Sequence, residues 1–287
     1  MNRRYLWLQV FDLKKLLLLF LLLVLLFGVI LYLERRALVY PELHRFQLSP
    51  KDFIQSKKLP AELVRPEVIE HGSRAKKQLA LTFDADMTPA MLVMLEKGIV
   101  KSWYNQEIKT IIDRENIHAT VFLGGLWSKT YPNEARDLAR DKLIELGNHS
   151  YNHSAFTVNC FKLPFIENSE NENEVLKAQE TILAITGVSV KYFRFPGGCY
   201  DRVDIETVAK LGLKIVHWDI SANDGFNNDA RSIINRVESQ VQNGSIVVFH
   251  IHDGSFAPKT HEAIKVIIPD LRKRGFEFVT ISELLKQ

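Results

Sequence analysis

The stretch Gly147-Asn148-His149-Ser150-Tyr151-Asn152-His153 places two histidines four residues apart. On one turn of backbone, imidazoles at this spacing can be presented to a single metal ion. With nine histidines in 287 residues, however, such a pair is a weak metal signal by itself. Its meaning for the fold therefore depends on the motifs that accompany it along the chain.

Four further motifs surround this pair, each at or just beyond a β-like apolar run. They are Thr82-Phe83-Asp84, Arg194-Phe195-Pro196-Gly197-Gly198, Trp218-Asp219 and Val247-Val248-Phe249-His250. Apolar runs at 78–83, 118–123, 191–194, 213–218, 245–249 and 276–279 alternate with helical patterns at 105–116, 132–146, 172–186, 202–212, 229–242 and 260–274. This alternation predicts an α/β fold of parallel strands joined by crossover helices. A doubly wound open sheet has the same pattern. The candidate chemical residues, however, lie at the ends of several different strands, and a barrel builds its active site from such residues at the carboxyl ends of its strands. The sequence therefore favours a barrel.

Taken in order, the five motifs resemble those of the polysaccharide deacetylases of the NodB type, carbohydrate esterase family four, over about residues 76–287. The resemblance implies a distorted (β/α) barrel in which a divalent metal and an Asp/His pair remove acetyl groups from N-acetylated sugars. Asp84 matches the catalytic base of the family, and Arg194 matches the arginine that holds this base by a forked hydrogen-bonded pair. His250 matches the acid that protonates the leaving amine.

The resemblance also implies a metal site with one altered ligand. His149 and His153 match the metal histidines of the family, and one carboxylate would complete the three protein ligands expected of a catalytic zinc. The family pattern T-F-D-D-G supplies that carboxylate from its second aspartate, but here the residue is Ala85, followed by Asp86. Either Asp86 coordinates after a local backbone shift, or water completes the site, or the chemistry needs no metal. We expect a divalent metal, zinc, with Asp86 or water in place of the lost ligand. The substitution Ala85→Asp should then tighten metal binding if Asp86 is not a ligand.

Two histidines compete for the role of acid. His252 lies two residues after His250 and points to the same side of a strand. His250 ranks first because the apolar strand stops there. Asp219 is the expected partner that raises the pKa of this histidine by charge pairing, and Asp224 is the alternative. Gly225 stands where the family has its second tryptophan.

The segment after Arg194 is expected to line the site. By the resemblance, Gly197 and Gly198 would supply backbone N–H groups to the oxyanion, and Tyr200 a wall of the sugar pocket, although two glycines also mark an ordinary turn. Cys160 and Cys199 each follow a catalytic motif closely, so a disulfide and two separate thiols are both compatible with the sequence.

The N-terminal segment predicts a membrane anchor. Residues 16–33 form a run of 18 residues without a charge, about 27 Å as a helix, and no small-x-small cleavage site follows. We expect a cytoplasmic N-terminus at 1–15, one transmembrane helix at 16–33, a linker at 34–75 and the catalytic domain at 76–287. Without residues 1–33 the chain has 33 basic and 33 acidic residues, so the net charge of +3 lies in the leader. This distribution favours an exported domain. The domain itself has no net positive charge, so its composition gives no indication of nucleic-acid binding.

The sequence thus predicts a membrane-anchored, metal-dependent N-deacetylase whose partners are an extracytoplasmic amino-sugar glycan and, through the N-terminal helix, the membrane. Two other classes of protein share its motifs. One is a metal-independent amidohydrolase that acts on cyclic amides, which full activity in a chelator would identify. The other is an inactive carbohydrate-binding relative, which turnover would exclude.

Overall fold

The fold is built on one parallel β-sheet. The computed structural model describes residues 66–286. The strands follow the order β1-β6-β5-β4-β3-β2-β8-β7, and β9 pairs with β2. Their bounds are β1 (Val68–Ile69), β2 (Gln78–Ala85), β3 (Ala119–Leu123), β4 (Ile144–Asn148), β5 (Tyr192–Phe193), β6 (Lys214–Val216), β7 (Ile220–Ser221), β8 (Ile246–His250) and β9 (Glu277–Phe278). Every ladder between these strands is parallel.

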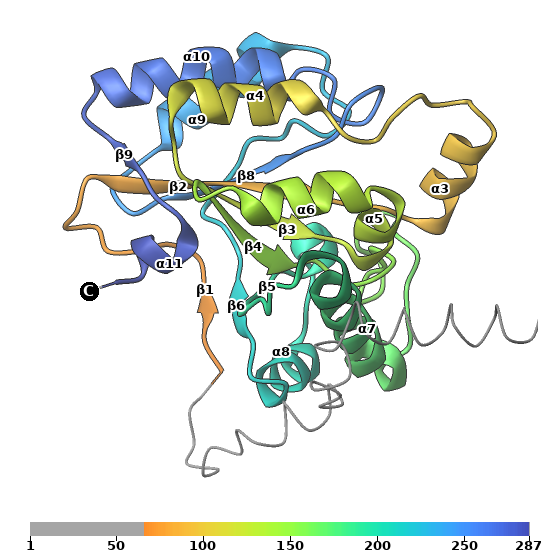
Figure 1. Cartoon of the computed structure of the whole chain (residues 1–287). Helices are drawn as coiled ribbons and strands as arrows, with labels where there is room; N and C mark the ends of the chain where they lie inside the picture. The colour runs from red at the N-terminus through yellow and green to blue at the C-terminus, as the bar shows by residue number, and fades with distance from the viewer. Residues whose placement is uncertain (1–65, 287) are drawn as a thin grey trace, which may run out of the picture. The chain divides into compact units, whose positions relative to one another are not determined.

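Helices connect the strands and cover the sheet (Figure 1). They are α3 (Pro89–Glu96), α4 (Gln106–Glu115), α5 (Gly125–Thr130), α6 (Pro132–Arg140), α7 (Asn168–Thr186), α8 (Arg202–Lys210), α9 (Ala230–Gln240), α10 (Thr260–Lys273) and α11 (Ile281–Leu284), with a 3-10 turn at Pro196–Gly198. Helix α10 packs against α4 and α9, whereas α7 packs against α5, α6 and α8. Among the described residues no ladder joins the edge strands β1 and β7, so the predicted barrel is an open, curled sheet.

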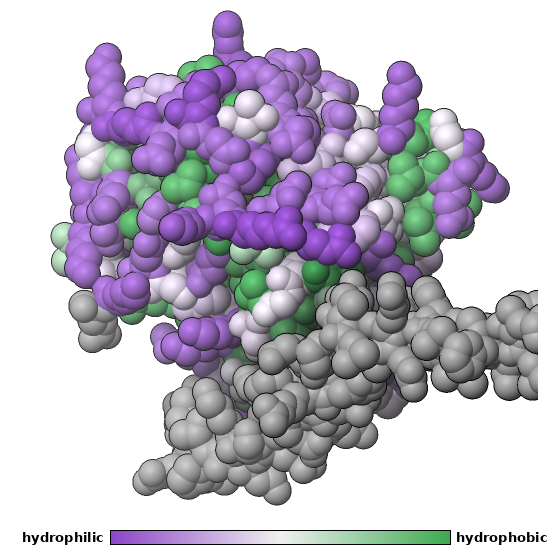
Figure 2. Space-filling model, viewed as in Figure 1, coloured by the Kyte–Doolittle hydropathy of each residue, from purple (hydrophilic) through white to green (hydrophobic). Residues whose placement is uncertain are grey.

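The hydrophobic core lies between the sheet and the helices, and the central strand β2 is part of it. From Leu79 to Ala85 every residue of this strand is buried, because β2 is flanked by β3 and β8 and covered on both faces. The apolar residues Leu79, Leu81 and Phe83 join the largest core cluster, and Ala85 joins it as well. The face of the molecule in Figure 2 is mainly hydrophilic, with scattered hydrophobic patches, as expected for a surface outside such a core.

The predicted elements match the structure with one correction. All six predicted strands are present, and five of the six predicted helices lie within a few residues of their expected bounds. The helix expected at 132–146 is wrong in its second half, because α6 ends at Arg140 and β4 begins at Ile144. Ile144 and Leu146 alternate with period two, and pairing of this segment between β3 and β5 overrides the helical pattern. Five further short helices and strands (β1, β7, α3, α5 and α11) were not predicted.

The predicted membrane span cannot be compared with the structure. Residues 16–33 and the expected cytoplasmic segment 1–15 lie outside the described residues, as does most of the linker 34–75. Within 66–286, no helix is both long enough and apolar enough to cross a bilayer.

Candidate active site

The polar residues at the strand ends meet at the carboxyl edge of the sheet. Asp84 is the penultimate residue of β2 and lies opposite His250, the last residue of β8. His149 follows β4 directly, and Arg194 follows β5, which pairs with β4. Because parallel strands end at one edge, four motifs that are distant in sequence converge there.

Asp84 is held by a buried arginine. Arg194 is fully buried, and its Nη1 donates to Asp84 Oδ1 at 2.7 Å. The same guanidinium donates to the carbonyl of His217 at 3.2 Å and lies 4.0 Å from the centroid of the Phe122 ring. The expected forked pair is therefore a single hydrogen bond, and the second Asp84 oxygen instead faces His149 Nε2 at 3.6 Å. Arg194 both orients the carboxylate and offsets its buried charge.

Asp86, His149 and His153 form a compact cluster of potential metal ligands. Asp86 Oδ1 lies 3.3 Å from His149 Nε2, and Asp86 Oδ2 lies 3.5 Å from His153 Nε2. One ligand atom from each residue falls within 4.8 Å of the others. Both Asp86 oxygens are buried and have no hydrogen-bond partner. A buried carboxylate left without hydrogen bonds between two imidazoles is the donor set that suits a divalent cation.

The tautomer of His149 and the neutral state of His153 suit a metal, although the Asp84 and Asp86 carboxylates outweigh burial and raise the pKa of His149. His149 Nδ1 donates to the Arg194 carbonyl at 2.9 Å, so its Nε2 carries the lone pair that faces the carboxylates when the ring is neutral. Burial lowers the pKa of His153 to about 4, so this imidazole is neutral at pH 7. Burial opposes ionisation of Asp86, but His153 and the neighbouring histidines outweigh it and hold the pKa of Asp86 well below its usual value.

Asp86 reaches the cluster because of strand periodicity. Alternate residues of an extended chain face the same side, which places Asp86 with Asp84 and turns Ala85 to the opposite face. Ala85 is fully buried in the core cluster that contains Leu81 and Phe83. The prediction that Ala85→Asp would supply a ligand is therefore corrected, since a carboxylate at this position would enter the apolar core.

The two histidines do not lie on a helix. The segment between them is a loop in which Ser150 (φ 65°) and His153 (φ 53°) adopt left-handed backbone conformations. Glu174 of α7 holds this loop: its carboxylate accepts from the N–H groups of Tyr151 and Asn152 at 2.9 and 3.0 Å. No motif marks Glu174 in the sequence, because it lies in an Asn/Glu-rich stretch at 167–174.

The partner of His250 is Asp224, not Asp219. His250 Nδ1 and Asp224 Oδ1 are 2.8 Å apart, and the His250 N–H donates to the other oxygen at 2.8 Å. Burial disfavours the imidazolium, but the Asp224 carboxylate outweighs this effect and raises the pKa of His250 to about 10. Asp219 instead accepts from Arg74 at 2.8 Å and from the Ile246 N–H at 2.8 Å, near the beginning of β8. Asp219 lies near the amino end of β8 because Ile220 pairs with Val247, a rung near the start of that strand.

His250 and His252 have different surroundings. The His250 side chain is 25% exposed, and its Nε2 lies 3.8 Å from Asp86 Oδ2. His252 is fully buried, and both of its ring nitrogens are engaged: Nδ1 with the Trp103 carbonyl at 2.8 Å, and Nε2 with the Asp86 N–H at 3.0 Å. The geometry thus favours His250 as the acid, because only its Nε2 is accessible.

The glycine segment near the site forms a tight turn. Gly197 (φ 63°) and Gly198 (φ 70°) are both left-handed. The Gly198 N–H, which was expected to face the oxyanion, donates to the Phe195 carbonyl at 2.9 Å within the turn. The ring of Tyr200 lies across that of His217, with their centroids 5.7 Å apart.

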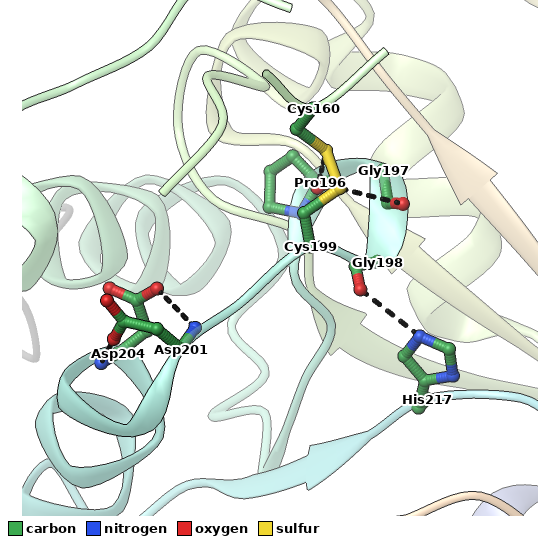
Figure 3. The surroundings of a disulfide bond; sticks show 8 residues. All are labelled: Cys160, Pro196, Gly197, Gly198, Cys199, Asp201, Asp204 and His217. Carbon is green, nitrogen blue, oxygen red and sulfur yellow. Dashed lines mark hydrogen bonds between the residues drawn. A yellow bond between two sulfur atoms is a disulfide. The ribbon is translucent and has the colours of Figure 1, made fainter. Parts of the chain in front are cut away.

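A disulfide joins the two loops that follow the motifs. Cys160 and Cys199 are bonded, with their Cα atoms 6.0 Å apart (Figure 3). A Cβ at Gly197 would lie 2.7 Å from Cys160 Sγ, so the bridge packs directly on the glycine turn. Of the two possibilities left open by the sequence, the structure has the disulfide, which fits an oxidising compartment.

Comparisons with known proteins point to one family. The family profile described as "Polysaccharide deacetylase" matches residues 71–216, a segment that includes Asp84, Asp86, His149, His153 and Arg194. A peptidoglycan-N-acetylglucosamine deacetylase of Bacillus cereus is 26% identical over 219 residues, covering 75% of this chain and 70% of that protein.

Solved structures share the fold. A CE4 family pseudoenzyme from Bacillus anthracis is 24% identical with a TM-score of 0.64, covering 77% of this chain and 69% of that one. A mutant of this pseudoenzyme, described as having restored enzymatic activity, is 25% identical at the same TM-score and covers 77% of this chain and 72% of that one. A family 4 acetyl xylan esterase from Clostridium thermocellum, solved with cobalt, is 25% identical with a TM-score of 0.57, covering 72% of this chain and 89% of that one.

Proposed function

The chain belongs to the polysaccharide deacetylase family, and we propose that it is a metal-dependent hydrolase that removes the N-acetyl group from an amino sugar in an extracytoplasmic glycan. One observation carries this proposal: the buried Asp86 carboxylate lies between His149 and His153 without a hydrogen-bond partner. Asp84 and His250 stand beside this cluster, each oriented by a partner of its own.

Each residue of the site has a separate role in amide hydrolysis. A divalent cation such as zinc, held by Asp86, His149 and His153, would polarise the acetamide carbonyl and lower the pKa of water. Asp84, positioned by Arg194, accepts a proton from the attacking water. His250, protonated at neutral pH because of Asp224, donates a proton to the sugar nitrogen as the C–N bond breaks. Water and the acetamide are converted to acetate and a free amine.

The test measures metal content and acetate release together. We expect the purified full-length chain to contain one equivalent of divalent metal and to release acetate from an N-acetylglucosamine oligomer or from peptidoglycan. Chelation should abolish the activity and zinc should restore it, because the carbonyl and the water lose their polarising charge. Unchanged activity in a chelator would identify a metal-independent amidohydrolase. Glycan binding without turnover would place the chain with the pseudoenzyme relatives.

We propose further that the domain is extracytoplasmic and anchored by residues 16–33. Support comes from the 18-residue uncharged run, the absence of a cleavage site after it and the disulfide between Cys160 and Cys199. The full-length protein should fractionate with membranes at its uncleaved mass, and external protease should digest the domain in spheroplasts. A soluble mature form beginning after residue 33 would contradict this assignment.

A further inference from the structure

The backbone leaves the sheet at Asp86. The ladder between β2 and β8 continues one residue past the end of β8, since the Ile251 N–H donates to the Asp84 carbonyl at 3.0 Å. One more rung of a parallel ladder would pair the Asp86 N–H with the Ile251 carbonyl. That carbonyl accepts instead from the Asn105 N–H at 2.9 Å. The Asp86 N–H donates to His252 Nε2 at 3.0 Å, so a side chain takes the place of the missing rung.

The His252 ring can make this bond in only one arrangement. A carbonyl oxygen can only accept, so the 2.8 Å contact with the Trp103 carbonyl places the ring proton on Nδ1. Nε2 then carries the lone pair that accepts from Asp86. The ring is fully buried and packs edge-on against Trp103 and Phe256, with centroids 6.4 and 4.8 Å away. The orientation of the His252 ring is thus fixed by a hydrogen bond at each ring nitrogen and by the aromatic rings packed against it.

The Asp86 side chain is not held in this way. Both carboxylate oxygens are without hydrogen bonds, and their neighbours are the imidazoles of His149, His153, His250 and His252 at 3.3–3.8 Å. The direction of the carboxylate therefore depends on the path of the backbone that carries it. The bond from the Asp86 N–H to His252 fixes this path where the ladder ends.

We propose that His252 is a positioning residue for the altered metal site: its imidazole holds the Asp86 backbone so that the Asp86 carboxylate faces His149 and His153. The proposal rests on the proposed function in treating Asp86 as a ligand. It assigns to His252 a role different from that of His250, although the two side chains are only two residues apart.

Two substitutions separate the two hydrogen bonds of the ring. His252→Asn keeps a donor near the position of Nδ1 for the Trp103 carbonyl but is too short to accept from Asp86. His252→Gln places its carbonyl oxygen near the position of Nε2 and keeps the acceptor. We expect the affinity of the full-length chain for Co²⁺, measured by chelator competition, to fall about 10–100-fold in His252→Asn, the usual cost of losing an outer-shell partner. His252→Gln should recover most of this loss.

The matched control is His118→Asn. His118 precedes β3 at the opposite end of the sheet, where its Nδ1 lies 2.7 Å from Glu283. This variant makes the same chemical change away from the site, so it reports any general effect of replacing a histidine by asparagine. Its affinity for Co²⁺ should equal that of the wild type.

A readout without metal distinguishes the positioning role from the metal proposal. Exchange of the Asp86 amide hydrogen should be roughly 10-fold faster or more in metal-free His252→Asn, because the N–H loses a buried acceptor. It should be close to the wild-type rate in His252→Gln and His118→Asn. If the wild type binds no Co²⁺ but exchange follows this order, His252 positions Asp86 and the metal-dependent function fails. If His252→Asn binds Co²⁺ as tightly as the wild type and its Asp86 amide exchanges at the same rate, the positioning role is refuted.

Discussion

Asp86→Ala is expected to remove the bound metal and to lower kcat/KM by roughly 10³-fold or more. Asp86 is the one carboxylate of the proposed ligand set, and its charge offsets that of the cation. Polarisation by a metal contributes several kcal/mol to the transition state, and each 1.4 kcal/mol is about tenfold in rate. The measurements are metal content after dialysis and acetate release. Retention of one equivalent of metal with full activity would show that Asp86 is not a ligand.

Two controls accompany this variant. Asp253→Ala removes an exposed carboxylate from the loop after β8 and should leave metal content and activity unchanged. The double variant Ala85→Asp/Asp86→Ala tests whether residue 85 can face the histidines instead of the core. Because Ala85 is buried in the core cluster, a carboxylate there would be an unpaired buried charge, so the double variant should be less stable and should not regain metal. Recovery of metal binding would mean that the backbone can shift to present position 85.

His250→Ala is expected to lower kcat by roughly 10²–10⁴-fold and to leave metal affinity intact, as for the loss of a general acid. The imidazole lies beside Asp86, and its Nε2 is the accessible nitrogen of the His250/His252 pair. In His252→Asn, by contrast, the main effect should be a lower affinity for the metal. If His250→Ala lost metal while His252→Ala lost only kcat, the two assignments would have to be exchanged.

The role of Asp224 provides a pH test of the same assignment. The folded-state pKa of His250, about 10, is above its ordinary value of 6.5, so the ion pair with Asp224 stabilises the protein below pH 6.5 and is lost as pH rises toward 10. Activity that needs the protonated imidazole declines over the same alkaline range. Asp224→Asn removes the negative charge, so the alkaline limb of kcat/KM should move to lower pH. Asp219→Asn, which alters a carboxylate near the other end of β8, should leave that limb in place.

The order of the motifs allowed most of the site to be predicted. Asp84, His149, Arg194 and His250 each follow or end an apolar run, and parallel strands bring such positions to one edge. The prediction failed for the carboxylate that pairs with His250. Asp219 and Asp224 are five residues apart, but β7 runs along β8 between them, so only Asp224 reaches the carboxyl end of β8.

Local sequence alone determined the alternation of strands and helices and the polar residues at the strand ends, because both depend on neighbours within a few residues. Tertiary structure alone decided that β4 interrupts an expected helix, that Cys160 and Cys199 are bonded, and that Ala85 enters the core while Asp86 faces the histidines. It also brought Glu174 to the histidine loop and His252 to the Asp86 N–H. Each of these outcomes depends on which groups meet when segments distant in sequence pack together, and buried polar groups must find their partners among them.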